Sequence, residues 1–138
     1  MSSEMTKYSN RITYQDGAYP NRDERRVSRI LVDKMDEDVL FLAPSRQKGA
    51  KTPDIRMQGL SWEIKTPRGK SSRTIENNFR NALKQSRNII FDLYRIGIRA
   101  EKAIAQINKQ SRNNRSTERV FVITKNGEIQ VIDMKRKF

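Results

Sequence analysis

The sequence contains no cysteine and no histidine. The absence of cysteine excludes a disulfide framework and thiolate chemistry. The absence of histidine excludes imidazole general-base mechanisms, histidine-bearing zinc sites, the Ser-His-Asp triad and every nuclease that depends on histidine. An enzyme made from this chain must therefore rely on carboxylates, on Lys, Tyr, Ser or Thr side chains, or on a bound metal ion.

Long hydrophobic runs are also missing. All apolar runs are far shorter than the roughly 20 residues that a transmembrane helix needs, so the sequence predicts no membrane span. The N-terminal residues Met1-Ser2-Ser3-Glu4 lack the apolar core of a signal peptide.

Positive charge, in contrast, is in large excess. The 138 residues include 29 Lys and Arg against 16 Asp and Glu, which gives a net charge of +13. Such an excess favours a polyanionic partner, first a nucleic acid and second an anionic membrane surface. The alternative is a solvated basic surface without a ligand.

Hydrophobic periodicity predicts a single mixed α/β (α+β) domain. Residues 1–21 show no clear period and are interpreted as a flexible or loosely docked lead-in to a domain over 22–138. In that domain the pattern predicts helices over about 23–35, 74–95 and 101–110, and strands over about 39–42, 53–57, 60–66, 119–124 and 128–133. The order predicts one mixed sheet flanked by helices.

The candidate chemistry lies on two predicted strands. Residues i and i+2 of a strand share a face, so Glu63 and Lys65 lie together. Asp54 precedes Glu63 by nine positions, and a hairpin at Gly59 would bring the two carboxylates together. Carboxylates at one spot repel each other and need a cation. With oxygen ligands only, Mg²⁺ or Mn²⁺ is the expected cofactor, and the backbone carbonyl of Ile64 could add a ligand.

Such a metal would bind a phosphate oxygen and activate a water for in-line attack. Lys65 would hold that water and stabilise the charge that develops on phosphorus, an electrostatic role. Glu24, near the start of the first predicted helix, could supply a further carboxylate. Either motif alone is weak, because Glu-x-Lys pairs are common on exposed strands and Pro-Asp is a common turn dipeptide. Their order along the chain is more specific.

Basic and polar residues flank these motifs and suit contacts with a phosphate backbone. Gln85, on a polar stripe of the predicted long helix, could approach either the active site or the nucleic acid. The alternative for this stripe is an ordinary boundary between core and solvent. The predicted nucleic-acid contacts are Arg46, Lys48, Lys51, Thr66, Arg68, Lys70, Arg73, Lys84 and Gln85.

A family resemblance covers most of residues 22–133. The chain resembles the PD-(D/E)XK nuclease superfamily, which has the restriction-endonuclease-like fold. More narrowly, it resembles the nuclease domain at the C-terminus of CdiA-type contact-dependent growth inhibition toxins. The residues that carry the resemblance include Lys51-Thr52-Pro53-Asp54-Ile55, Gly59, Trp62-Glu63-Ile64-Lys65-Thr66-Pro67, Gln85-Ser86, Asn88-Ile89-Ile90 and Asp92-Leu93.

The resemblance implies a divalent-metal phosphodiesterase in which Asp54 and Glu63 are metal ligands, Lys65 is catalytic and Glu24 is the acidic residue of the first helix. It implies RNA, more specifically tRNA, as the substrate, and a cognate immunity protein as a partner. It also implies action in the cytoplasm after delivery within a larger exported toxin. This chain begins with Met and has no delivery region, so an excised toxin domain and a free-standing relative from a phage or mobile element both remain open.

Two alternatives remain for the activity itself. The first is a DNase of a phage or mobile element with the same fold, since related folds cut DNA. The second is a nucleic-acid-binding module without catalysis, which the net charge alone would support.

Overall fold

The computed structural model describes residues 7–47 and 49–135. Within them, seven strands form one sheet in which strand order follows the chain. Strands β1–β2, β4–β5 and β5–β6 pair in parallel, and the other neighbours pair antiparallel. The strands are β1 (Ile12–Tyr14), β2 (Val39–Phe41), β3 (Ile55–Met57), β4 (Leu60–Lys65), β5 (Asn88–Asp92), β6 (Arg119–Ile123) and β7 (Ile129–Met134).

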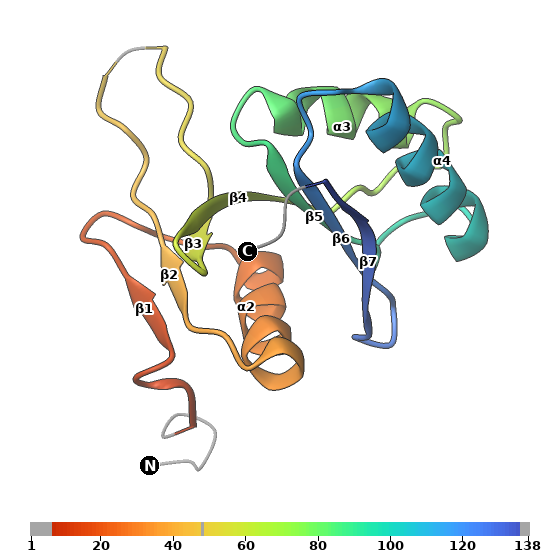
Figure 1. Cartoon of the computed structure of the whole chain (residues 1–138). Coiled ribbons are helices and arrows are strands. Elements are labelled where there is room, and N and C mark those ends of the chain that lie inside the picture. The colour runs from red at the N-terminus through yellow and green to blue at the C-terminus, as the bar shows by residue number, and fades with distance from the viewer. Residues whose placement is uncertain (1–6, 48, 136–138) are drawn as a thin grey trace.

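Helix α2 (Arg22–Met35) packs on one face of the sheet, and α3 (Thr74–Leu83) and α4 (Ala100–Asn113) pack on the other (Figure 1). Buried Val27 and Leu31 of α2 belong to a core with Trp62 and Phe121. Ile75 and Phe79 of α3 belong to a second core with strand residues of the opposite face, including Ile89, Phe91 and Val120. The predicted mixed α/β sheet flanked by helices is thereby confirmed.

The predicted long helix over 74–95 is wrong. Helix α3 ends at Leu83, the backbone N–H groups of Gln85 and Ser86 bond back to Ala82, and the chain then enters β5. Every residue of β5 is buried, since parallel neighbours flank it and helices cover the sheet. Such a continuous apolar run fits a helix stripe as well as a buried strand, and neither Gly nor Pro marks the boundary.

Part of the segment interpreted as a lead-in is hydrogen-bonded into the sheet. Strand β1 pairs with β2, so Ile12 lies opposite Val39 and is buried in the core beside α2. The three-residue strand is too short to show a period in the sequence. The other predicted helices and strands are confirmed, and their ends differ from the predicted ones by at most three residues.

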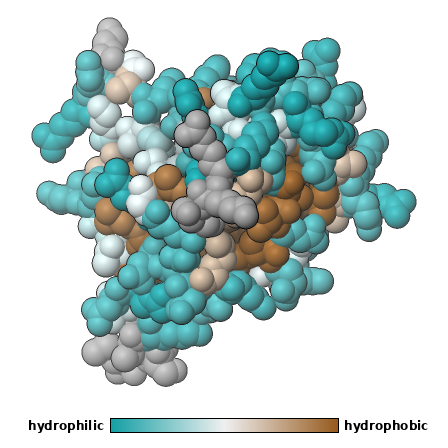
Figure 2. Space-filling model, in the orientation of Figure 1, coloured by the Kyte–Doolittle hydropathy of each residue, from teal (hydrophilic) through white to brown (hydrophobic). Residues whose placement is uncertain are grey.

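Residues 42–47 and 49–54, between β2 and β3, project away from the sheet (Figure 1). Hydrophilic side chains cover most of the face in Figure 2, with a hydrophobic band across its middle. In the described part of the chain, the helices are too short or too polar to cross a membrane.

Candidate active site

The β3–β4 hairpin places Asp54 beside β4. Gln58 and Gly59, at its turn, have φ of 58° and 73°, and the left-handed backbone of the turn suits glycine. The Asp54 N–H donates to the Trp62 carbonyl over 3.0 Å, which continues the β3–β4 pairing by one bond. Pro53 then offers no N–H to extend it. The next N–H of β4 on this side, that of Ile64, instead donates to Asp54 Oδ2 over 2.8 Å.

Glu63 precedes Ile64 in β4, and its carboxyl group interacts with that of Asp54. It is only 3% exposed, and Lys65 Nζ lies 3.3 Å from its Oε2. The amide nitrogen of Gln85, turned toward Glu63, donates to both carboxylate oxygens, at 2.6 Å to Oε1. Gln85 therefore reaches the predicted site, although from the turn that follows α3 rather than from the middle of a helix.

Glu24 approaches from α2. Its backbone N–H donates to Asn21 Oδ1 and its Oε1 accepts from the Asn21 N–H, both over 2.8 Å. This capping box fixes the helix start. The same carboxyl group interacts with that of Asp54. The structure thus brings together Glu24, Asp54, Glu63 and Lys65, all four residues that the sequence predicts to be catalytic.

Burial makes these carboxylates difficult to ionise. Burial first, and the negative charge of Glu63 second, raise the pKa of Asp54 to about 7, although the Ile64 N–H opposes the rise. Burial also raises the pKa of Glu63 and of Glu24 above the ordinary value. Since Asp54 and Glu63 interact directly, a proton on one carboxyl group favours ionisation of the other. An excess of buried negative charge of this kind is relieved by a cation.

Two small cavities reach Asp54. One, of about 180 Å³, includes Lys51, Pro53 and Gln85 in its lining. The other, of about 190 Å³, includes Tyr19, Pro20 and Glu24. Asp54 lines both cavities, so the residue borders one cavity shared with Glu24 and another shared with Gln85.

The residues present fit a hard divalent cation. Asp54 and Glu63 offer carboxylate oxygens, and the donor set contains no nitrogen or sulfur ligand, which suits Mg²⁺ or Mn²⁺. The N–H and C=O of one strand residue point to the same side, so the Ile64 carbonyl faces the side of Asp54. Among residues 7–47 and 49–135, no group of three or more acidic side chains is arranged to hold a metal. The candidate ligand set is therefore two carboxylates and one backbone oxygen.

The predicted nucleic-acid contacts that the structure describes fall into three groups. Lys51 and Gln85 line the cavity at Asp54. Lys48 lies outside the described residues, and four others are exposed: Arg46, Lys70, Arg73 and Lys84. Thr66 and Arg68 contact acidic groups of the protein, because Thr66 Oγ1 donates to Asp92 over 3.1 Å and Arg68 lies 3.3 Å from Asp23.

The sequence interpretation missed an ionic cluster beside this site. Asp92, 0% exposed at the end of β5, pairs with Arg26 of α2. Asp23 pairs with Arg26 at 2.6 Å and with Arg95 at 2.9 Å. Asp92 and Arg26 lie 66 positions apart, so no local pattern could connect them. One signal was readable: Arg22, Arg25, Arg26 and Arg29 follow the i, i+3, i+4, i+7 spacing of a single helix face.

Comparisons with known proteins agree on one family. The model of the contact-dependent growth inhibition CdiA C-terminal domain matches residues 51–129, more than half of the chain. The CdiA-CT/CdiI toxin and immunity complex from Burkholderia pseudomallei contains a chain of similar fold, with a TM-score of 0.60 at 21% identity, over 88% of this chain and 98% of that chain. No curated protein matches. The chain belongs to the family of CdiA C-terminal toxin domains of contact-dependent growth inhibition.

Proposed function

We propose that this toxin domain is a divalent-metal-dependent endonuclease that hydrolyses nucleic-acid phosphodiesters, with RNA, and tRNA in particular, as its substrate. The observation that carries the proposal is that Asp54, just before β3, lies against β4 beside Glu63 and Lys65. A buried and a half-buried carboxyl group with raised pKa values, beside an ammonium group, are unusual in a purely structural role. Such a site suits the metal-assisted hydrolysis that PD-(D/E)XK nucleases, which this chain resembles, carry out.

Asp54, Glu63 and the backbone oxygen of Ile64 would hold the cation, which supplies a polarised phosphate oxygen and an activated water when bound. The ammonium group of Lys65, 3.3 Å from Glu63 Oε2, orients the attacking water and stabilises negative charge that develops on the phosphate. Gln85 fixes the carboxylate of Glu63 by donating to it. Glu24 faces Asp54 from α2 and orients the water or a ligand there.

The net charge of +13 supports a polyanionic substrate. The preference for RNA over DNA rests on the family resemblance alone, and so do action in the cytoplasm and a cognate immunity protein for this chain. The solved relative of similar fold is itself a toxin and immunity complex.

The decisive experiment incubates the protein with tRNA, total RNA and plasmid DNA, each with Mg²⁺, with Mn²⁺ and with chelator. We expect metal-dependent cleavage of RNA by the wild type, and none by Asp54→Asn, Glu63→Gln or Lys65→Ala. Lys102→Ala, an exposed charge on α4, is the control and retains activity. Cleavage of DNA alone would show that the substrate is DNA and not RNA. No cleavage of any substrate would leave a binding module, and cleavage by Asp54→Asn would refute the site.

A further inference from the structure

The outer face of α2 carries a stripe of arginines, which we call the α2 arginine stripe: Arg22, Arg25, Arg26 and Arg29. The stripe lines a cavity of about 540 Å³ together with Tyr94 and Arg95. Every described residue in that lining is an arginine or a tyrosine. At a rise of 1.5 Å per residue, the stripe extends about 10 Å along the helix. Such a length matches about three phosphates of a stacked strand at 3.4 Å each.

The ionic cluster holds two of the cavity-lining arginines, Arg26 and Arg95, in place. Arg26 and Arg95 pair with Asp23, and Arg26 also pairs with the buried Asp92. The guanidinium of Arg26 lies 4.1 Å from the centre of the Tyr94 ring. Arg22, Arg25 and Arg29 are exposed along the same face. Acidic partners thus hold Arg26 and Arg95 in place, while Arg22, Arg25 and Arg29 present positive charge to solvent along the helix.

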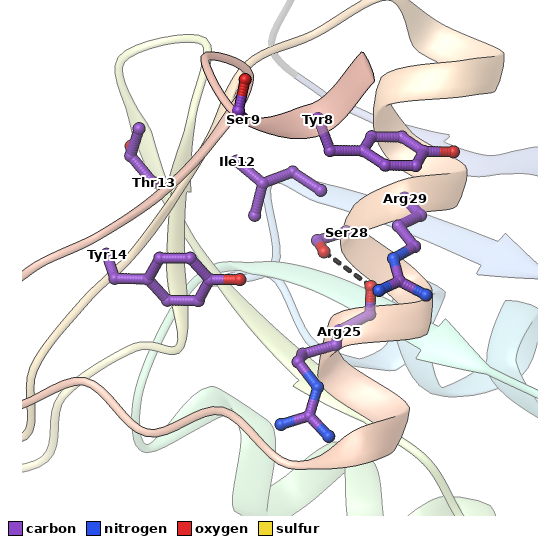
Figure 3. Close-up of a pocket in the computed structure, with 8 residues that line it drawn as sticks. All are labelled: Tyr8, Ser9, Ile12, Thr13, Tyr14, Arg25, Ser28 and Arg29. Atoms are coloured by element: carbon purple, nitrogen blue, oxygen red, sulfur yellow. Dashed lines mark hydrogen bonds between the residues drawn. The ribbon is translucent and has the colours of Figure 1, made fainter. Parts of the chain in front are cut away.

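A second cavity, of about 530 Å³, lies next to the stripe and shares Arg25 and Arg29 with it (Figure 3). Tyr8 and Tyr14 line it from the N-terminal segment and β1, and Ile12 lies between them. Figure 3 shows the Tyr14 side chain directed across this tyrosine pocket toward α2. Tyr14 stacks on Phe41 at 5.3 Å between ring centres yet is 51% exposed. The Tyr14 ring is thus supported by Phe41 and still offers exposed aromatic surface.

The stripe also leads to the candidate active site. Arg25 Nη1 donates to the Pro20 carbonyl over 2.8 Å, and Pro20 lines the cavity that holds Glu24 and Asp54. Tyr19, in the same lining, is 90% exposed. Positive charge and exposed aromatic rings therefore continue from the carboxylates to the tyrosine pocket.

We propose that this surface binds a single-stranded segment of the substrate polynucleotide, with phosphates on Arg25 and Arg29 and an unpaired base in the tyrosine pocket. Guanidinium groups pair with phosphates, and base stacking on aromatic rings with a basic groove is how proteins hold single strands. A base paired within a duplex cannot enter such a pocket. Because the occupant is the substrate of the candidate nuclease, this inference rests on the proposed function.

The test measures binding rather than cleavage. Asp54→Asn protein in chelator is titrated against a labelled single-stranded RNA of about 12 nucleotides, within the usual range of site sizes. Arg25→Gln/Arg29→Gln is compared with Lys102→Gln/Lys109→Gln, which removes two exposed charges from α4. We expect the α2 pair to weaken binding at least ten-fold relative to the α4 pair. The slope of log affinity against log salt should fall by about 1.4, or 0.7 per lost phosphate contact.

Tyr14→Ala tests the base subsite. The substitution should weaken binding of the normal oligonucleotide about five-fold or more. It should leave the affinity for an abasic oligonucleotide unchanged. Tyr14→Phe, which keeps the aromatic ring, should bind the normal oligonucleotide as the unsubstituted protein does. Equal binding by the α2 and α4 pairs would overturn the phosphate path. An equal loss with the abasic strand would overturn the base subsite. If a mononucleotide or polyglutamate competes as well as the oligonucleotide does, the proposal that a single-stranded polynucleotide occupies this surface is wrong.

These outcomes separate the two proposals. If the wild type cleaves no nucleic acid but the α2 pair still weakens binding, the surface stands and the nuclease proposal fails. If the wild type cleaves RNA but the two pairs bind alike, the nuclease proposal stands and the surface assignment fails. Unchanged thermal unfolding of the α2 pair, whose side chains are exposed, confirms that its fold is intact.

Discussion

Asp54 takes the place of a backbone carbonyl at the end of the β3–β4 pairing, where its Oδ2 accepts the N–H of Ile64 over 2.8 Å. The hydrogen bond holds the carboxyl group against β4 and beside Glu63, with which it interacts directly. The position is costly in the absence of a cation, because burial and the second negative charge both oppose ionisation. Several measurable consequences arise from this arrangement.

Asp54→Asn should stabilise the metal-free protein while abolishing cleavage. The amide keeps an acceptor for the Ile64 N–H and removes the repulsion from Glu63. A pKa of about 7 instead of 3.8 corresponds to a gain on the order of 2 kcal/mol at pH 8 once solvent screening is allowed for. Chemical denaturation in chelator measures the gain. A variant less stable than wild type at pH 8 would contradict the repulsion.

The pH dependence of stability should run opposite to that of a salt-bridged carboxylate. Because the pKa of Asp54 is raised, the native state binds more protons than the unfolded state between about pH 4 and pH 7. The free energy of unfolding of the metal-free protein therefore falls as pH rises through that window, and the stabilisation is fully present only near pH 4. Urea denaturation from pH 4 to pH 8 measures this trend, which should flatten in Asp54→Asn.

Metal binding should release a proton. The cation competes with protons for the carboxyl groups of Asp54 and Glu63, whose pKa values are raised, so Mn²⁺ should bind more tightly at pH 8 than at pH 6. Calorimetry in two buffers of different ionisation enthalpy measures the proton directly. A pH-independent affinity with no proton released would place the metal elsewhere.

Gln85→Ala should lower kcat about ten-fold with a smaller effect on KM. The amide orients Glu63, and losing a group that orients a ligand costs 10- to 100-fold. Steady-state kinetics on the RNA substrate tests this expectation. Asn77→Ala, exposed on α3, is the control on the same helix, and an equal loss of kcat in both variants would remove Gln85 from the site.

Arg26→Ala should destabilise the fold by about 3 kcal/mol at pH 8, since it leaves the buried Asp92 without its ionic partner. Burial raises the pKa of Asp92 although Arg26 opposes the rise, so the variant can protonate Asp92 and should lose less stability at pH 5. Arg112→Ala, exposed on α4, should change stability little at either pH. Denaturation of both variants at the two pH values decides the matter.

The sequence predicted the hairpins and the residues that meet at the candidate site because each has a local signal. Gly59 and Asn126-Gly127 mark turns, and strand alternation pairs Glu63 with Lys65. The boundary between α3 and β5 has no such signal: apolar side chains serve a helix stripe and a buried parallel strand equally well. The network of Asp23, Arg26 and Asp92 joins segments distant in sequence, so only the tertiary structure reveals it.

The capping box of α2 has a consequence for how the domain tolerates change. One side chain, Glu24, both closes the first turn of α2 through Asn21 and faces Asp54. Selection for a stable fold and selection for toxicity therefore act on the same residue. In a deep mutational scan, glutamine at this position would preserve abundance and lose toxicity, whereas alanine would lose both. Comparing glutamine with alanine at position 24 would thus separate the contribution of this side chain to folding from its contribution to toxicity.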